Sequence, residues 1–229
     1  MTGWLRTPPG RSTWIVALLA LLALLALPAA LDAQRDADRD RWQRVSDVFA
    51  AMGIGAGSYV ADVGAGDGYF TVRLADHVGG SGRVYAVDID DDALDRLQGL
   101  VESDGLTNVA VTRGSADDPR LPDGVLDAVL VVNAYHEMTA YAGMLAGMYR
   151  ALEPGGRLVI LDFQPPDEST SRASQTARHT IALELAAEDL EQAGFEITRR
   201  DASFAERGSR GSRNREWLLV GRRPPGPDR

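Results

Sequence analysis

VADVGAGDGYF, residues 60–70, is the stretch that decides how this chain folds. It predicts a buried strand over 59–63, then a tight turn, then a helix that begins near Tyr69. The turn contains three glycines: Gly64, Gly66 and Gly68. Glycines there can adopt φ > 0 and let the backbone approach a ligand, and the helix behind them presents free N–H groups. A second apolar run, RVYAVDI (83–89), carries Asp88 near its end, where nucleotide-binding βαβ units grip a ribose diol. The two signals together predict an adenosine-containing ligand.

The spacing of the glycines decides between adenosine ligands. The dinucleotide fingerprint is G-x-G-x-x-G, and counted from Gly64 its third glycine would fall on Tyr69. The pattern here is G-x-G-x-G, with Asp62 two residues before the first glycine. In this respect the sequence resembles the class I S-adenosylmethionine-dependent methyltransferases. Their first motif is D-x-G-x-G-x-G and their second strand ends in an acid, here Asp88.

Two later segments resemble the same family. Residues 151–162 (ALEPGGRLVILD) are similar to its L-x-P-G-G-x-L strand entry, and residues 126–133 (LDAVLVVN) are similar to its fourth strand. The resemblance extends from about residue 41 to residue 223, with the motifs in the family's order. It implies an α/β fold, a doubly wound, seven-stranded, mostly parallel sheet with helices on both faces and an antiparallel last strand (the Rossmann-like methyltransferase fold). It also implies S-adenosyl-L-methionine as the cofactor.

Composition excludes several other kinds of chemistry. The 229 residues are 45% hydrophobic, enough for one domain with a sizeable core. There is no cysteine, which excludes disulfides, thiolate catalysis and Cys-ligated zinc. All 24 basic residues are arginine, which excludes lysine Schiff bases and the P-loop lysine. The three histidines lie far apart in the sequence without metal-ligand spacing, so no metal site is expected. A net charge of −9 argues against nucleic acid as a partner.

The N-terminus has the layout of a secretory signal peptide. Arg6 and Arg11 precede an apolar run over 14–27, and small residues follow as far as Ala33. We therefore expect residues 1–33 to be a signal peptide or an uncleaved membrane anchor. Both alternatives place the rest of the chain outside the cytoplasmic membrane, because the arginines stay on the cytoplasmic side. The remaining alternative is a misassigned start codon, which would leave the protein in the cytoplasm.

The order of elements predicts one methyltransferase domain over 34–223, followed by a disordered tail over 224–229. Strands are expected at 59–63, 83–89, 109–113, 126–132, 157–163, 195–204 and 215–221. Helices are expected at 42–52, 69–77, 91–103, 139–152 and 175–193, the last with a break inside it. Their alternation is typical of a doubly wound sheet. Residues 164–174, rich in Pro and Ser, predict a mobile loop.

The resemblance assigns most of the cofactor site to the first two strands. It implies that the turn passes beneath the methionine and the ribose through Gly64, Ala65, Gly66 and Gly68. Asp62 corresponds to the family's acid near the amino-acid end of the cofactor. Asp88 should accept two hydrogen bonds from the ribose hydroxyls, and Ile89 should pack on the adenine. The alternative for these residues is an ordinary strand-to-helix turn.

Residues 114–117 (GSAD) resemble the family's adenine-binding loop after the third strand. There Ala116 would offer its N–H and Asp117 its carboxylate to the exocyclic amine. Position 115, often Asp in the family, is Ser115 here. The alternative is an acidic surface turn.

Residues 133–137 (NAYHE) follow the fourth strand, and ligands in open α/β sheets sit at the carboxyl ends of strands. Asn133 should flank the cofactor, while Tyr135, His136 and Glu137 should face the methyl acceptor. His136 could act as a general base if the acceptor is a hydroxyl; the alternative is a helix-capping polar cluster. His179 is a weaker candidate for the acceptor site. The basic run 207–215 could grip an anionic partner or form a solvated hairpin loop.

Three hypotheses follow for the function. The first is methyl transfer to a small-molecule acceptor, whose identity no segment specifies. The second is an NAD-dependent oxidoreductase, opposed by Tyr69 and by the absence of a Tyr-x-x-x-Lys pair. The third is an exported, non-catalytic binding protein that retains the cofactor fold. The oligomeric state is not specified by any segment.

Overall fold

The computed structural model describes residues 34–206 and 215–226. The described residues fall into two compact units, which divide between Arg44 and Val45. In the first unit, residues 34–42 are helical. The expected leader (1–33), nearly all of the basic run and the last three residues of the expected tail lie outside the described residues. Within the described residues, no helix is both long and apolar enough to cross a membrane.

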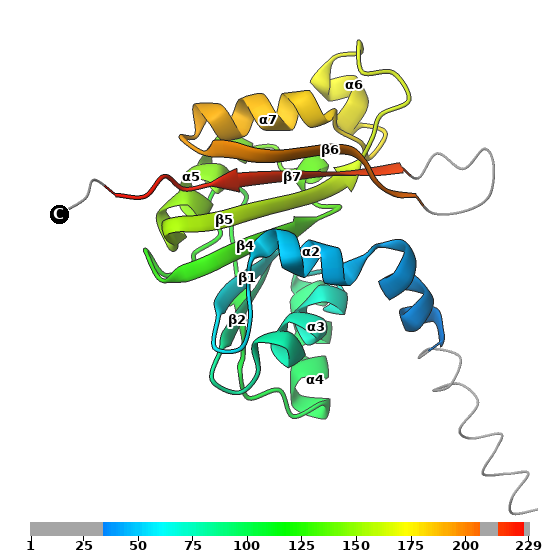
Figure 1. Ribbon diagram of the computed structural model, residues 1–229. Coiled ribbons are helices and arrows are strands. Elements are labelled where there is room, and N and C mark those ends of the chain that lie inside the picture. The colour runs from blue at the N-terminus through cyan, green and yellow to red at the C-terminus, as the bar shows by residue number, and fades with distance from the viewer. Residues whose placement is uncertain (1–33, 207–214, 227–229) are drawn as a thin grey trace, which may run out of the picture. The chain divides into compact units, whose positions relative to one another are not determined.

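The second unit alternates strands and helices (Figure 1). Its strands are β1 (Tyr59–Val63), β2 (Arg83–Asp88), β3 (Val109–Arg113), β4 (Leu126–Val132), β5 (Leu152–Phe163), β6 (Glu196–Glu206) and β7 (Arg215–Arg222). Its helices are α2 (Val45–Met52), α3 (Tyr69–Val78), α4 (Asp91–Ser103), α5 (Tyr141–Ala151), α6 (Arg172–Thr176) and α7 (Leu183–Gln192), with a short 3₁₀ helix η1 (Tyr135–Glu137).

The strands form one seven-stranded sheet in the order β3-β2-β1-β4-β5-β7-β6. Strands β3, β2, β1, β4 and β5 pair in parallel, whereas β7 pairs antiparallel with both β5 and β6. The order reverses between β1 and β4, which creates a crevice outside their carboxyl ends. The expected doubly wound, mostly parallel sheet is confirmed.

Helices cover both faces of the sheet, as expected. Helices α2, α3 and α4 pack on one face, and α5 and α7 pack on the other. Strand β4 shows why helices are needed on both faces. Its side chains alternate between two hydrophobic cores, one on each face of the sheet. Ala128 and Leu130 belong to the first core, and Val129 and Val131 to the second, all with no exposed surface. A strand buried on both faces is continuously apolar, which is the pattern in the sequence.

Strand β5 differs from expectation at its start because of strand pairing. Strand β5 begins at Leu152 rather than at Arg157, because Leu152 pairs with Leu126 before the register shifts. The break expected inside the helix over 175–193 is confirmed: α6 and α7 are separate helices, and between them His179 has a left-handed backbone with φ 54°.

The expected mobile loop over 164–174 is tied down by one buried side chain. The amide nitrogen of Gln175 donates to the carbonyl oxygens of Glu168 and Thr170, at 3.1 Å and 2.8 Å. Its amide oxygen accepts from the N–H of Ala182 at 2.8 Å. A glutamine that is 1% exposed therefore joins the loop to the start of α7.

Candidate active site

A cavity of about 290 Å³ lies at the carboxyl ends of β1, β2 and β4. We call it the first cavity. Of the residues expected in the site, it is lined by Gly64, Gly66, Asp88, Ile89, Ala116, Asn133 and Glu137. These residues come from four separate segments, which the parallel strands bring to one edge of the sheet. This is the crevice where open α/β sheets bind ligands.

The glycine turn lies close to the turn after β4. Gly64 has φ 77°, and a Cβ atom built on it would lie 2.4 Å from the Cβ of Ala134. No larger residue fits between the two turns without displacing one of them. Gly66 has φ 54°, but a Cβ atom there would meet nothing within 4 Å, since the residue faces the open cavity. The turn is thus a backbone surface over which a ligand can lie.

Asp88 is held in place by three backbone N–H groups. Its Oδ1 accepts from Ile89 at 2.7 Å and from Asp90 at 3.0 Å, and its Oδ2 accepts from Gly66 at 2.9 Å. A carboxylate offers about four acceptor positions. Accepting both ribose hydroxyls would therefore require one of these N–H groups to be released or shared.

Three expected cofactor residues support the turn and do not line the first cavity. Asp62, only 2% exposed, accepts a 2.7 Å hydrogen bond from the Thr71 hydroxyl and so joins β1 to α3. Ala65 is buried in the core on the α3 side. A Cβ atom on Gly68 would lie 2.7 Å and 2.8 Å from the Leu97 and Leu100 side chains. None of the three lines the first cavity, and their expected contact with the cofactor stays a prediction.

The loop after β3 contributes Ser115 and Ala116 to the first cavity, but not Asp117. The Asp117 carboxylate instead accepts from the Ser115 hydroxyl at 2.9 Å. The Asp117 carbonyl group packs against α5, where a Cβ atom on Gly143 would lie 2.6 Å from its oxygen. Ser115, which departs from the family's pattern, is the polar side chain that this loop offers to the cavity.

Asn133 lines the first cavity and has a buried acceptor atom that no donor satisfies among the described residues. It has a left-handed backbone, φ 52°, and its amide nitrogen donates to Oε1 of the fully buried Glu216 at 2.9 Å. Its Oδ1 atom is buried and has no hydrogen-bond donor among the described residues. Buried polar atoms are rarely left unpaired, so this atom fits the donor of a bound ligand. Glu216, which positions it, comes from β7 and was not anticipated.

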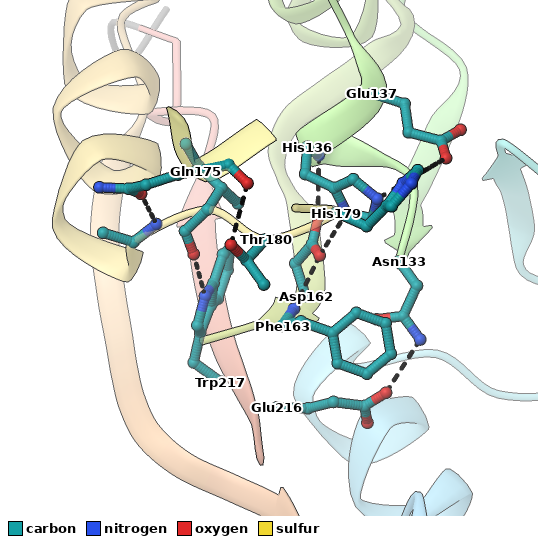
Figure 2. A network of polar contacts seen from close by, with 12 residues as sticks. Asn133, His136, Glu137, Asp162, Phe163, Gln175, His179, Thr180, Glu216 and Trp217 are labelled. Atoms are coloured by element: carbon teal, nitrogen blue, oxygen red, sulfur yellow. Dashed lines mark hydrogen bonds and ion pairs between the residues drawn. The ribbon is translucent and has the colours of Figure 1, made fainter. Parts of the chain in front are cut away.

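His136 has the partner that the sequence did not reveal (Figure 2). Its Nδ1 lies 2.7 Å from Oδ1 of Asp162, and its backbone N–H donates to Oδ2 at 3.0 Å. Asp162 is fully buried at the end of β5, and His136 is 5% exposed. The carboxylate fixes the orientation of the ring and directs Nε2 toward Glu137, whose Oε1 is 3.7 Å away.

The electrostatic surroundings of His136 favour its protonated form. Burial lowers its pKa, but the hydrogen bond to Asp162 and the negative charges of Asp162 and Glu137 outweigh burial, and the pKa is raised above its ordinary value. A histidine supported in this way by a buried carboxylate can take up a proton and hold it.

Tyr135, which was expected to face the acceptor, is buried and lines neither cavity. Its side chain is 1% exposed and its hydroxyl donates to Oδ2 of Asp189 at 2.7 Å. Asp189, on α7, also pairs with Arg172 on α6. Burial and the neighbouring carboxylate raise the pKa of Tyr135, so the phenol stays a neutral donor. Tyr135 therefore joins η1 to α6 and α7.

A second, more open cavity of about 610 Å³ adjoins the first. We call it the second cavity. The two share Glu137, Met138 and Thr139. Its other walls come from His136 and Tyr141 and from α6, including Arg172. His179 lies beside it, with Nδ1 3.6 Å from Oε1 of Glu137.

Known proteins resemble the part of the chain that builds the first cavity. Residues 60–156 match a protein-family model described as a methyltransferase domain. The matched residues form a domain of the class I S-adenosylmethionine-dependent methyltransferase type. A crystal structure of a SAM-dependent methyltransferase from Aquifex aeolicus shares the fold, with a TM-score of 0.69 over 86% of this chain and 98% of that one, at 22% identity.

Curated relatives match over about half of the chain. The ubiquinone/menaquinone biosynthesis C-methyltransferase of Marinomonas sp. (strain MWYL1) is 32% identical over 127 residues, which are 55% of this chain and 50% of that protein. The demethylmenaquinone methyltransferase of Geobacillus sp. (strain WCH70) is 31% identical over 126 residues, 55% of this chain and 53% of that protein. The chain thus spans about half the length of the curated relatives it matches.

Proposed function

We propose that this protein transfers a methyl group from S-adenosylmethionine to a small-molecule acceptor of the quinone type. The observation that carries the proposal is the meeting of two cavities at Glu137, Met138 and Thr139. One cavity offers a glycine turn and a fixed carboxylate, and the other has a carboxylate-supported histidine in its wall. Two reactants that must meet end to end need such adjoining spaces.

The residues of the first cavity fit an adenosine-containing sulfonium. Asp88 and Ser115 offer acceptors to ribose and adenine, and the exposed Ile89 offers an apolar surface beside them. The free Oδ1 of Asn133 is suited to a donor such as the amino group of the methionine part. S-adenosylmethionine supplies an already activated methyl group, so the protein has mainly to orient the reactants and exclude water.

We assign the acceptor to the second cavity and proton removal to His136. When an acceptor hydroxyl lies beside Nε2, His136 takes its proton while Asp162 keeps the ring in place. Loss of that proton raises the electron density of an aromatic acceptor, and a ring carbon attacks the methyl carbon while the bond from the methyl carbon to the sulfonium sulfur breaks. S-adenosylhomocysteine leaves, and the methylated ring carbon then releases its hydrogen as a proton, which restores the aromatic ring. Two relatives, a C-methyltransferase of ubiquinone and menaquinone biosynthesis and a demethylmenaquinone methyltransferase, support a quinol as the acceptor.

The test is methyl transfer from isotope-labelled S-adenosylmethionine to a reduced, demethylated quinone by the purified full-length chain. We expect label in the quinol and none without protein. Unlabelled phenols and amines of similar size serve as competing acceptors. Transfer only to an amine would contradict the quinone assignment, and transfer to none, with the cofactor bound, would favour the non-catalytic hypothesis.

A further inference from the structure

The fold brings together two histidines and a carboxylate that are scattered in the sequence. Nε2 of His136 lies 3.7 Å from Oε1 of Glu137, and Nδ1 of His179 lies 3.6 Å from the same oxygen. All three ligand atoms lie within 4.8 Å of one another. Figure 2 shows the two imidazoles and the carboxylate converging from the turn after β4 and from the segment between α6 and α7.

We propose that His136, Glu137 and His179 form a binding site for a divalent transition-metal ion of the zinc type. Zinc takes nitrogen and oxygen ligands at about 2.0–2.2 Å, which places tetrahedral ligand atoms roughly 3.4 Å apart. The two measured separations exceed this by only a few tenths of an ångström, within reach of small side-chain rotations. Two imidazoles and one carboxylate are a ligand set that zinc and similar ions use in catalytic sites.

The second shell of the site is already built. Metal-bound histidines commonly donate their other ring N–H to a carboxylate, which fixes the tautomer and the ring orientation. Asp162 does this for His136: it is fully buried, it lies 2.7 Å from Nδ1, and it leaves Nε2 as the unprotonated atom of the neutral ring. A carboxylate–histidine pair directed at two further ligands distinguishes this cluster from an accidental gathering of surface residues.

The other surroundings suit a cation with one open position. Arg172, a cation in the wall of the second cavity, is neutralised by its pairing with Asp189. His179 has a left-handed backbone, φ 54°, a conformation found preferentially where function requires it. Three protein ligands leave a fourth position beside the second cavity for water or an acceptor oxygen.

Nε2 of His136 cannot hold a metal ion and a substrate proton together, so the two roles belong to different states of the site.

The test measures Zn²⁺ binding by the full-length, tag-free chain after chelator treatment, in competition with a metal-sensitive dye and without cofactor or acceptor. We expect about one ion per chain. His179→Ala and Glu137→Ala should each weaken binding by more than about 100-fold, beyond the 10–100-fold typical of a lost second-shell partner. His77→Ala, which removes the remaining histidine on α3, should leave binding unchanged.

Both side chains removed are largely exposed, 75% for His179 and 64% for Glu137, so the variants should fold, and circular dichroism checks this. Absence of binding by the wild type, or equal binding by His179→Ala, would overturn the site. Because no cofactor is present in this experiment, absence of Zn²⁺ binding would not contradict the proposed methyl transfer. Absence of methyl transfer would likewise not contradict the metal site.

Discussion

At the scale of single residues, the position of His136 depends on a contact between distant parts of the chain. Its partner Asp162 is 26 residues away and meets it only because β4 and β5 are neighbours in the sheet. The sequence identified His136 as a candidate by its place after a strand. It did not show which acidic residue would hydrogen-bond to the imidazole. An acid at the end of the next strand, as in 157–163, is the signal that could have suggested the pair.

Replacing His136 tests its role as a base. His136→Ala should lower turnover by about 10²-fold or more, the usual contribution of a positioned general base, while cofactor affinity changes little because His136 is not in the lining of the first cavity. Steady-state kinetics and calorimetry measure the two quantities, and His77→Ala is the matched control. Parallel losses of turnover and cofactor affinity would show that His136 shapes the cofactor site instead.

The two cavity-lining glycines of the turn should differ in their tolerance of a side chain. Both have positive φ, which costs an L-residue about 1–2 kcal/mol, but only at Gly64 would the new Cβ atom collide with Ala134. Gly64→Ala should therefore lower the free energy of unfolding by at least about 1 kcal/mol more than Gly66→Ala. Urea denaturation of the two variants gives the comparison. Equal destabilisation would mean that the turns after β1 and β4 are not in close contact.

At the scale of elements, the sequence predicted the bounds of a strand best where its apolar residues are also the residues that the sheet buries. Strands β1, β3 and β4 have their expected bounds, because each is an apolar run covered on both faces or followed by a turn. Pairing with a neighbouring strand extends β5 at its start, and the local sequence could not show this extension. Tyr135 is a similar case: its hydroxyl meets Asp189 from 54 residues away, which only the packing of α7 brings about.

The hydrogen bond between Tyr135 and Asp189 should stabilise the join between η1, α6 and α7. Tyr135→Phe leaves the buried Asp189 with one partner fewer and should lower the free energy of unfolding by about 1–3 kcal/mol. Tyr149→Phe on α5 is the control and should change it by less than about 0.5 kcal/mol. Denaturant titration measures both. A Tyr135→Phe variant as stable as the wild type would rule out a stabilising role for this bond.

At the scale of the whole molecule, the resemblance of a few motifs was enough to predict the sheet and its two helical layers. The second cavity was less predictable, since it combines the turn after β4 with α6 and lies beside His179.

We propose that residues 1–33 direct export or anchor the chain. N-terminal sequencing of protein from its native host should begin near Gln34, or the intact chain should sediment with membranes. Full-length protein in the soluble cytoplasmic fraction would contradict both versions.

The central claim is that the crevice between β1, β2 and β4 holds S-adenosylmethionine by way of Asp88. Calorimetric titration of the full-length chain should show binding of S-adenosylmethionine and none of NAD. Asp88→Ala should weaken that binding by about 1.5–3 kcal/mol, the range for hydrogen bonds to a charged group. Asp92→Ala, an exposed acid on the neighbouring helix, should leave it unchanged. Unaltered affinity of Asp88→Ala, or preferential binding of NAD, would contradict the account.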